Sequence, residues 1–133
     1  MLLPHGTIVA LVDGQNFTLF RNAGNETEPE LVESPAPTLD SDNRSGTSHH
    51  SRPGNHADSQ VSEDAHAIAA VEWLNSQVLG HHIENLVVIA PPRTLGEMRR
   101  HYHKQLDHVL RGELAKELAG RTGPEIITAL RVN

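Results

Sequence analysis

Three carboxylates of the chain could act on phosphate esters through bound metal ions. Asp13 ends an apolar run, and Glu63 and Asp64 begin a region with helical periodicity. A two-metal nuclease would need a further carboxylate directly after the apolar residues 86–89, because its carboxylates must converge on both ions. Residues 90–92 read Ala-Pro-Pro instead. The sequence therefore favours a turn role for Asp13, whose side chain can accept hydrogen bonds from nearby backbone amides.

The histidines of the chain could bind zinc only if several imidazoles converged. Neither dense group contains the H-E-x-x-H pairing that puts two imidazoles and a base on one helix face. The chain also lacks cysteine, a G-x-S-x-G elbow, a Walker loop and a dinucleotide fingerprint. We therefore expect surface histidines, no cofactor and no enzymatic activity. The two groups are His101, His103 and His108, and His49, His50 and His56.

A local excess of basic residues follows the apolar residues 86–89. The chain as a whole carries a formal charge of −6, which argues against broad binding to nucleic acid by counterion release. The basic residues could meet phosphate or an acidic partner, or they could form a solvated helix face with Glu97 as a partner. Both interpretations stay open from the sequence. The cluster consists of Arg93, Arg99, Arg100, Lys104 and Arg111.

Length and composition indicate one domain over residues 1–133. No window approaches the roughly 18 apolar residues of a membrane span, and the amino terminus lacks the charged and apolar regions of a signal peptide. We therefore expect a soluble, unprocessed and cytoplasmic protein without membrane insertion.

The first third of the chain predicts a three-stranded meander followed by a long loop. Residues 7–12 and 17–21 suit two strands around an Asp-Gly turn whose glycine can take positive φ, and residues 30–33 suit a third strand. Residues 35–60 hold almost no large aliphatic side chain, so burial cannot offset the entropy of ordering them. This segment is expected to be a mobile loop.

The remaining two thirds predict helices alternating with strands. Apolar residues from Val61 to Val78 recur at helical spacing, with Ser62 as a possible N-cap and Gly80 as a stop. After a strand at residues 85–90, covered on both faces, Thr94 and Glu97 have the spacing of a capping box.

The second helix should bear Leu95, Met98, Tyr102 and Leu106 on one apolar face. Residues 109–118 fit either a helix or a strand by spacing, and a strand suits an α/β architecture better. Residues 123–130 predict a last helix with proline in its first turn. The expected fold is thus α/β with a single mixed sheet, in the order βββ-α-β-α-β-α, which is the ribonuclease-H-like order.

Several of these segments resemble the bacterial host attachment protein family, whose members are grouped with the middle domain of archaeal and eukaryotic peptide-chain release factors. The resemblance covers essentially the whole chain. Its most specific part is the run Ala90-Pro91-Pro92-Arg93-Thr94-Leu95-Gly96; the others are Val12-Asp13-Gly14, Phe20-Arg21-Asn22 and Gly112-Glu113-Leu114-Ala115-Lys116-Glu117-Leu118.

The resemblance implies a translation-associated protein that binds the ribosome or RNA without catalysis. In the release factors the long loop bears Gly-Gly-Gln, whereas residues 52–56 of this chain read Arg-Pro-Gly-Asn-His, so peptide release is not carried over. An indirect role in host attachment or adhesion, and a hydrolase that uses loop histidines, remain alternatives. The expected binding residues are Arg44, Arg52, Gly54, Arg93, Arg99, Arg100 and Lys104.

Overall fold

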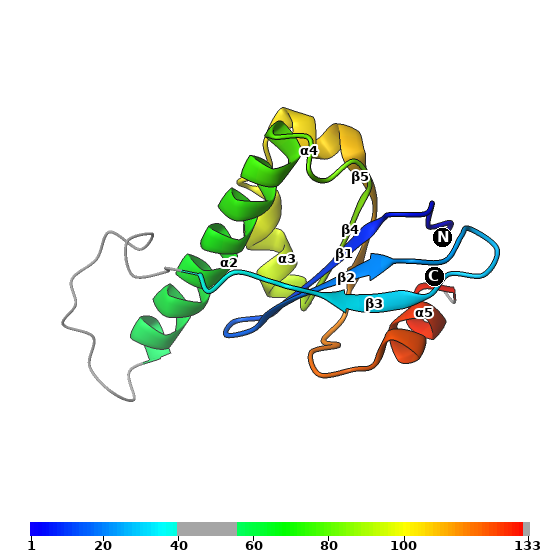
Figure 1. The fold of residues 1–133 in the computed structure, drawn as a ribbon. Coiled ribbons are helices and arrows are strands. Elements are labelled where there is room, and N and C mark those ends of the chain that lie inside the picture. Colours follow the sequence, from blue (N-terminus) through cyan, green and yellow to red (C-terminus); the bar gives the residue numbers. More distant parts are fainter. Residues whose placement is uncertain (40–55, 132–133) are drawn as a thin grey trace.

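The computed structural model describes residues 1–39 and 56–131 (Figure 1). The predicted mobile loop falls mainly on residues 40–55, which lie outside the described residues. None of the described helices is both long and apolar enough to span a bilayer. The elements are β1 (Ile8–Val12), β2 (Phe17–Asn22), β3 (Leu31–Ser34), α2 (His56–Leu79), β4 (Leu86–Ala90), α3 (Pro92–Arg99), α4 (Lys104–Val109), β5 (Leu110–Ala115) and α5 (Gly123–Arg131).

The described strands form one mixed sheet in the order β3-β2-β1-β4-β5. The meander pairs antiparallel, whereas β4 lies parallel to β1 and β5 lies parallel to β4. This confirms the predicted α/β class with a single mixed sheet, and it confirms a strand within residues 109–118. The description as ribonuclease-H-like stays a prediction.

Helices cover both faces of the sheet. Helices α2, α3 and α4 lie on one face and α5 lies on the other, close to β3 (Figure 1). Side chains alternate along the central strands, so that Val87 and Ile89 of β4 pack toward α5 while Leu86 and Val88 pack toward α2. All of β4 is buried, as expected for a strand covered on both faces.

The first long helix starts earlier than its apolar pattern predicts. Helix α2 begins at His56, so residues 56–60 are helical rather than part of the predicted loop, and Ser62 lies inside the helix instead of capping it. Apolar spacing marks only the part of a helix that packs on the sheet, and α2 extends beyond that part.

The carboxyl end of α2 forms a Schellman motif around a histidine. His81 takes the left-handed conformation, with φ 62°. Its amide bonds to the carbonyl of Val78, and the amide of His82 bonds to that of Gln77. Gly80 directly follows the helix, as predicted, but the left-handed position falls one residue later.

The predicted second helix is two helices. Helix α3 ends at Arg99 and α4 begins at Lys104, with an extended His103 as the α4 N-cap. The capping box predicted for Thr94 and Glu97 is absent, because α3 already starts at Pro92 and has no side-chain cap. Proline suits this position, since its fixed φ matches the first helical turn.

The last helix has the capping box that α3 lacks. The Thr122 amide donates to Glu125 Oε1 over 2.9 Å, and the Glu125 amide lies 3.4 Å from Thr122 Oγ1. The bond from the Thr122 amide is the main cause that lowers the pKa of Glu125. The predicted helix with proline in its first turn is confirmed.

Candidate functional site

Asp13 serves as the organising residue of the β1–β2 turn. Its Oδ1 accepts bonds from the amides of Gln15 (2.8 Å) and Asn16 (2.6 Å), and its Oδ2 accepts one from Asn16 Nδ2 (2.9 Å). The structure thus agrees with the turn role predicted from the sequence. Gly14 does not take the positive φ expected of it. Glycine fits this position because the Glu63 side chain packs against it, and a Cβ on residue 14 would lie only 2.7 Å from the Glu63 side chain.

The histidine nearest to this turn is held by the backbone. His66 Nδ1–H donates to the Asp13 carbonyl over 2.9 Å, which leaves Nε2 as the basic nitrogen when the ring is neutral. Across the residues that the structure describes, no three His, Asp or Glu side chains gather closely enough to hold a metal ion. His49 and His50 lie outside those residues, and so does the side chain of His56, so the proposed hydrolase chemistry of the loop is untested.

The Asp13 turn predicts a specific dependence of stability on pH. Burial alone would raise the pKa of Asp13, but the hydrogen bonds from Asn16 and Gln15 outweigh it and lower the pKa below 3.8. Because the folded-state pKa is depressed, the carboxylate stabilises the fold above about pH 4, and this contribution is lost as the pH falls through the lowered value. Asp13→Asn should therefore reduce stability at pH 7 by at most about 1 kcal/mol, since the group is only partly buried and solvent screens its charge.

The measurement is urea unfolding of both proteins from pH 7 to pH 2.5. The gap between wild type and Asp13→Asn should close on the acid side, while Glu28→Gln, which removes a carboxylate without a described side-chain partner, should show no such closing. A gap of constant size at all pH values would contradict the role of the charge.

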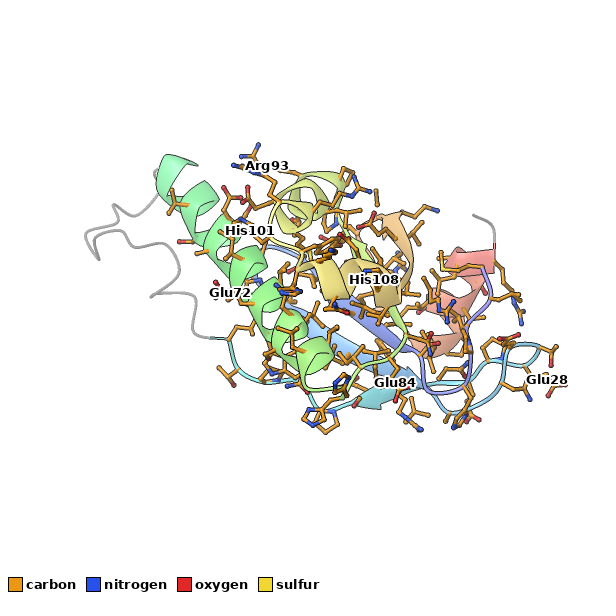
Figure 2. The ribbon with its side chains drawn as sticks, turned by 90° about the horizontal axis from the view of Figure 1, so that it is seen from above. Glu28, Glu72, Glu84, Arg93, His101 and His108 are labelled. Carbon is orange, nitrogen blue, oxygen red and sulfur yellow. The ribbon has the colours of Figure 1, made fainter. Side chains whose placement is uncertain are left out.

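The basic cluster is distributed over α3, α4 and β5. Arg93 lies in the first turn of α3, Arg99 ends that helix, Arg100 is its C-cap and Lys104 begins α4. Figure 2 shows Arg93 beside α2, at the opposite end of the molecule from Glu28. Three of the predicted binding residues, Arg44, Arg52 and Gly54, lie outside the described residues.

Arg99 is held by a carboxylate from the sheet. Its Nε and Nη2 lie 3.0 and 2.8 Å from Oε1 of Glu113 on β5. The other oxygen of Glu113 accepts a 2.8 Å bond from the hydroxyl of Tyr102. Burial and this bond raise the pKa of Tyr102, so the phenol stays protonated and acts as a donor.

Arg100 makes a longer ion pair, with Glu97, which precedes it by three residues. Its Nη1 lies 3.4 Å from Oε1 of Glu97, whose other oxygen accepts a 3.0 Å bond from His101 Nε2. One interpretation of the sequence is that Glu97 pairs with basic side chains on a solvent-exposed helix face. That interpretation is confirmed for Arg100, whereas the partner of Arg99 is Glu113.

Arg93 and Lys104 differ from these two arginines. Both side chains are exposed, and neither has an ion-pair or hydrogen-bond partner within residues 1–39 and 61–131. Arg111, the last member of the cluster, donates from Nε to Asn85 Oδ1 over 2.6 Å. Among the described cations of the cluster, Arg93 and Lys104 are therefore the most available for an anionic partner.

Asn75 on α2 fixes the break between α3 and α4. Its Nδ2 donates to the His101 carbonyl and its Oδ1 accepts from the His103 amide, both over 3.0 Å. These bonds satisfy backbone groups that a continuous helix would have paired internally. Sequence reasoning missed this residue, because a half-buried asparagine in an apolar helical pattern gives no indication of its partner.

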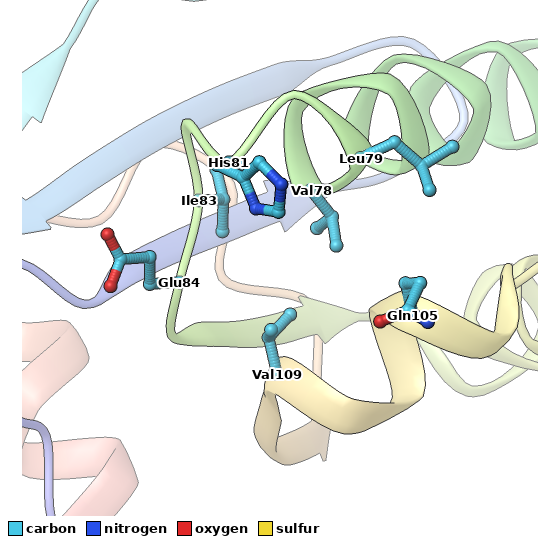
Figure 3. A pocket seen from close by; sticks show the side chains of 7 residues that line it. All are labelled: Val78, Leu79, His81, Ile83, Glu84, Gln105 and Val109. Atoms are coloured by element: carbon cyan, nitrogen blue, oxygen red, sulfur yellow. The ribbon is translucent and has the colours of Figure 1, made fainter.

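An open groove lies between the carboxyl end of α2 and helix α4. It has a volume of about 590 Å³, and Val78 and Leu79 face Gln105 and Val109 across it (Figure 3). Its lining is mainly aliphatic and holds no cluster of reactive groups, which gives it no evident chemistry.

Comparison with known families finds one match that covers almost the whole chain. Residues 6–130 match the family described as bacterial archaeo-eukaryotic release factor family 12. This confirms the relation to release-factor domains that the sequence resemblance predicted; the host-attachment name stays a prediction. A search of curated proteins finds no match.

Proposed function

Since the chain belongs to bacterial archaeo-eukaryotic release factor family 12, we propose that it is a non-enzymatic protein that binds ribosomal RNA through the helical layer formed by α3 and α4. Peptide release is no part of this proposal, because the sequence contains no Gly-Gly-Gln. Family membership supports a link with translation, and the cations of the helical layer supply the chemistry for the contact.

The observation that carries the proposal is the pair of available cations, Arg93 and Lys104. They stand at the first turns of α3 and α4, and both helices pack against α2 on the same face of the sheet. Lysine and arginine side chains without an internal carboxylate can neutralise phosphates and release their counterions. With a formal net charge of −6, the rest of the protein repels RNA, so contact is confined to this layer.

The decisive experiment is sedimentation with ribosomes across a salt series. The double variant Arg93→Ala with Lys104→Ala should bind more weakly at low salt, and the slope of log affinity against log salt should fall by about 1.4, or roughly 0.7 for each phosphate contact with single-stranded RNA. The fold should be unaffected, because both side chains are exposed.

A matched control removes the same charge elsewhere. Arg121→Ala with Arg131→Ala changes two exposed arginines at and before α5, on the other face of the sheet, and should leave the salt slope unchanged. Recovery of the protein only in the cell envelope, with no ribosome association at low salt, would contradict the proposal and favour a role in attachment. Hydrolytic activity that is lost on substitution of His49 and His50 would favour the hydrolase alternative.

A further inference from the structure

Two glutamates in the α3–α4 region share one arrangement of partners. Each carboxylate uses one oxygen for an arginine and the other for a ring donor. Glu113 binds Arg99 and the Tyr102 hydroxyl. Glu97 binds Arg100 and the His101 ring, the pair of contacts described above.

Within each set, the arginine is the exposed member. The side chains of Arg99 and Arg100 are 55% and 74% exposed, whereas those of Glu113 and Glu97 are 18% and 17% exposed. An arginine in such a position can turn toward solvent without moving the backbone, while its glutamate stays in place. The two ion pairs can thus open from the solvent side.

We propose that Arg99 and Arg100 are reserve phosphate contacts, which Glu113 and Glu97 neutralise in the free protein and which a bound polyanion draws away. This inference rests on the proposed function and adds its regulation. The pairs suppress binding of scattered anions, because a ligand must first compete with an internal carboxylate. A polyanion that is already anchored by Arg93 and Lys104 brings further phosphates close to the same helix.

The hydrogen bonds from Tyr102 and His101 lower the free-energy cost of releasing the two arginines. When Arg99 leaves, the Tyr102 hydroxyl still donates to Glu113 over 2.8 Å, so the half-buried carboxylate is not left without a partner. His101 does the same for Glu97 over 3.0 Å. A carboxylate stripped of every donor would instead incur most of its desolvation penalty. The arginine loses no hydrogen bonds when it changes partner, because a phosphate can accept two N–H groups of the guanidinium just as a carboxylate can.

The test uses single-stranded poly(U) as the probe and follows its affinity between 50 and 200 mM salt. Glu113→Gln removes the carboxylate that competes for Arg99 and should bind poly(U) about two- to fivefold more tightly than wild type. The slope should stay that of wild type, because Arg99 contacts phosphate in both complexes. For Arg99→Ala, the loss of affinity over this salt range should be about threefold smaller than for wild type, because one phosphate contact is missing. Glu97→Gln should act in the same direction through Arg100 and provides a second variant should Glu113→Gln fold poorly.

Two further variants separate release from a purely structural role. Tyr102→Phe removes the donor that remains on Glu113, so it should weaken poly(U) binding, the effect opposite to that of Glu113→Gln. In a protein that already carries Arg99→Ala, Tyr102→Phe should have no effect on binding. Glu28→Gln removes one negative charge far from α3 (Figure 2) and controls for net charge.

The outcomes distinguish this inference from the proposed function. If wild type binds poly(U), both glutamine variants show its affinity and Arg99→Ala shows its slope, then Arg99 and Arg100 are not reserve contacts, and the proposed function stands. If neither wild type nor the glutamine variants bind, both are wrong. Equal effects of Glu28→Gln and Glu113→Gln would reduce the result to net charge and would also overturn the inference.

Discussion

Replacing Asn22 by leucine is expected to lower the free energy of unfolding by about 3 to 5 kcal/mol, because one buried and two partly buried backbone groups lose their partner. Asn22 is fully buried at the end of β2. Its Nδ2 donates to the Leu3 carbonyl over 2.7 Å, and its Oδ1 accepts 2.9 Å bonds from the amides of Gly24 and Glu30. The side chain therefore joins the amino-terminal segment to both sides of the β2–β3 connection.

Leucine has the same branching and the same number of side-chain heavy atoms as asparagine but no polar atom, so the substitution removes the hydrogen bonds and keeps the branched shape of the side chain. Each unsatisfied buried group costs roughly 1 to 3 kcal/mol, and a domain of this size has only about 5 to 15 kcal/mol in total. Urea denaturation should show a large fall of the midpoint, or a protein that is unfolded without denaturant. Asn16→Leu, at an exposed turn position, should change stability by less than about 1 kcal/mol. A loss below 1 kcal/mol for Asn22→Leu would contradict its role.

The strands are predictable because most carry a local pattern. The continuous apolar run of β4 indicates burial on both faces, and β4 is buried throughout. Strand β5 is different, since the spacing of Leu110, Leu114 and Leu118 suits a helix equally well. Only the need for the chain to return beside β4 favours a strand there. The parallel register that pairs Val88 with Glu113 shows how the sheet decides the outcome.

Two Thr-x-x-Glu segments show why helix ends are harder to predict. The spacing is identical at Thr94–Glu97 and at Thr122–Glu125, yet only the second is a capping box. Helix α3 starts at Pro92 because β4 ends at Ala90, so Thr94 is already inside the helix and Glu97 contacts the following turn. The start of a helix depends on the elements that precede and contact it in the fold, and the spacing of two residues carries no information about those elements.

In the candidate site, contacts between residues close in sequence are predictable, whereas contacts between distant residues are not. The pairing of Glu97 with Arg100 follows from a separation of three residues on one helix. Glu113 lies 14 residues from Arg99 and reaches it only because β5 returns beneath the end of α3. The break between α3 and α4 at residues 100–103 is also not predictable from the sequence, because the apolar residues on either side keep helical spacing across it. These residues are Leu95, Met98, Tyr102 and Leu106. Asn75 of α2, distant in sequence, supplies the bonds that make the break possible.

Replacing Leu106 by alanine is expected to cost about 2 to 5 kcal/mol, the usual range for a fully buried leucine. Leu106 is the buried residue of the six-residue helix α4 and is 0% exposed. A helix this short is not stable by itself in water, so its position depends on Leu106 and on the Asn75 bonds. The loss should therefore include local opening of α4, which carries Lys104.

Urea unfolding measures the global loss, and amide hydrogen exchange at residues 106–109 measures the local opening. Leu79→Ala is the matched control, because Leu79 lines the neighbouring groove of Figure 3 but is 49% exposed, so the same change should cost less than about 1 kcal/mol. If Leu106→Ala costs no more than Leu79→Ala, α4 is held by something other than its buried leucine. If α4 opens while ribosome binding is unchanged, Lys104 is not a contact, and the proposed interface shrinks to α3.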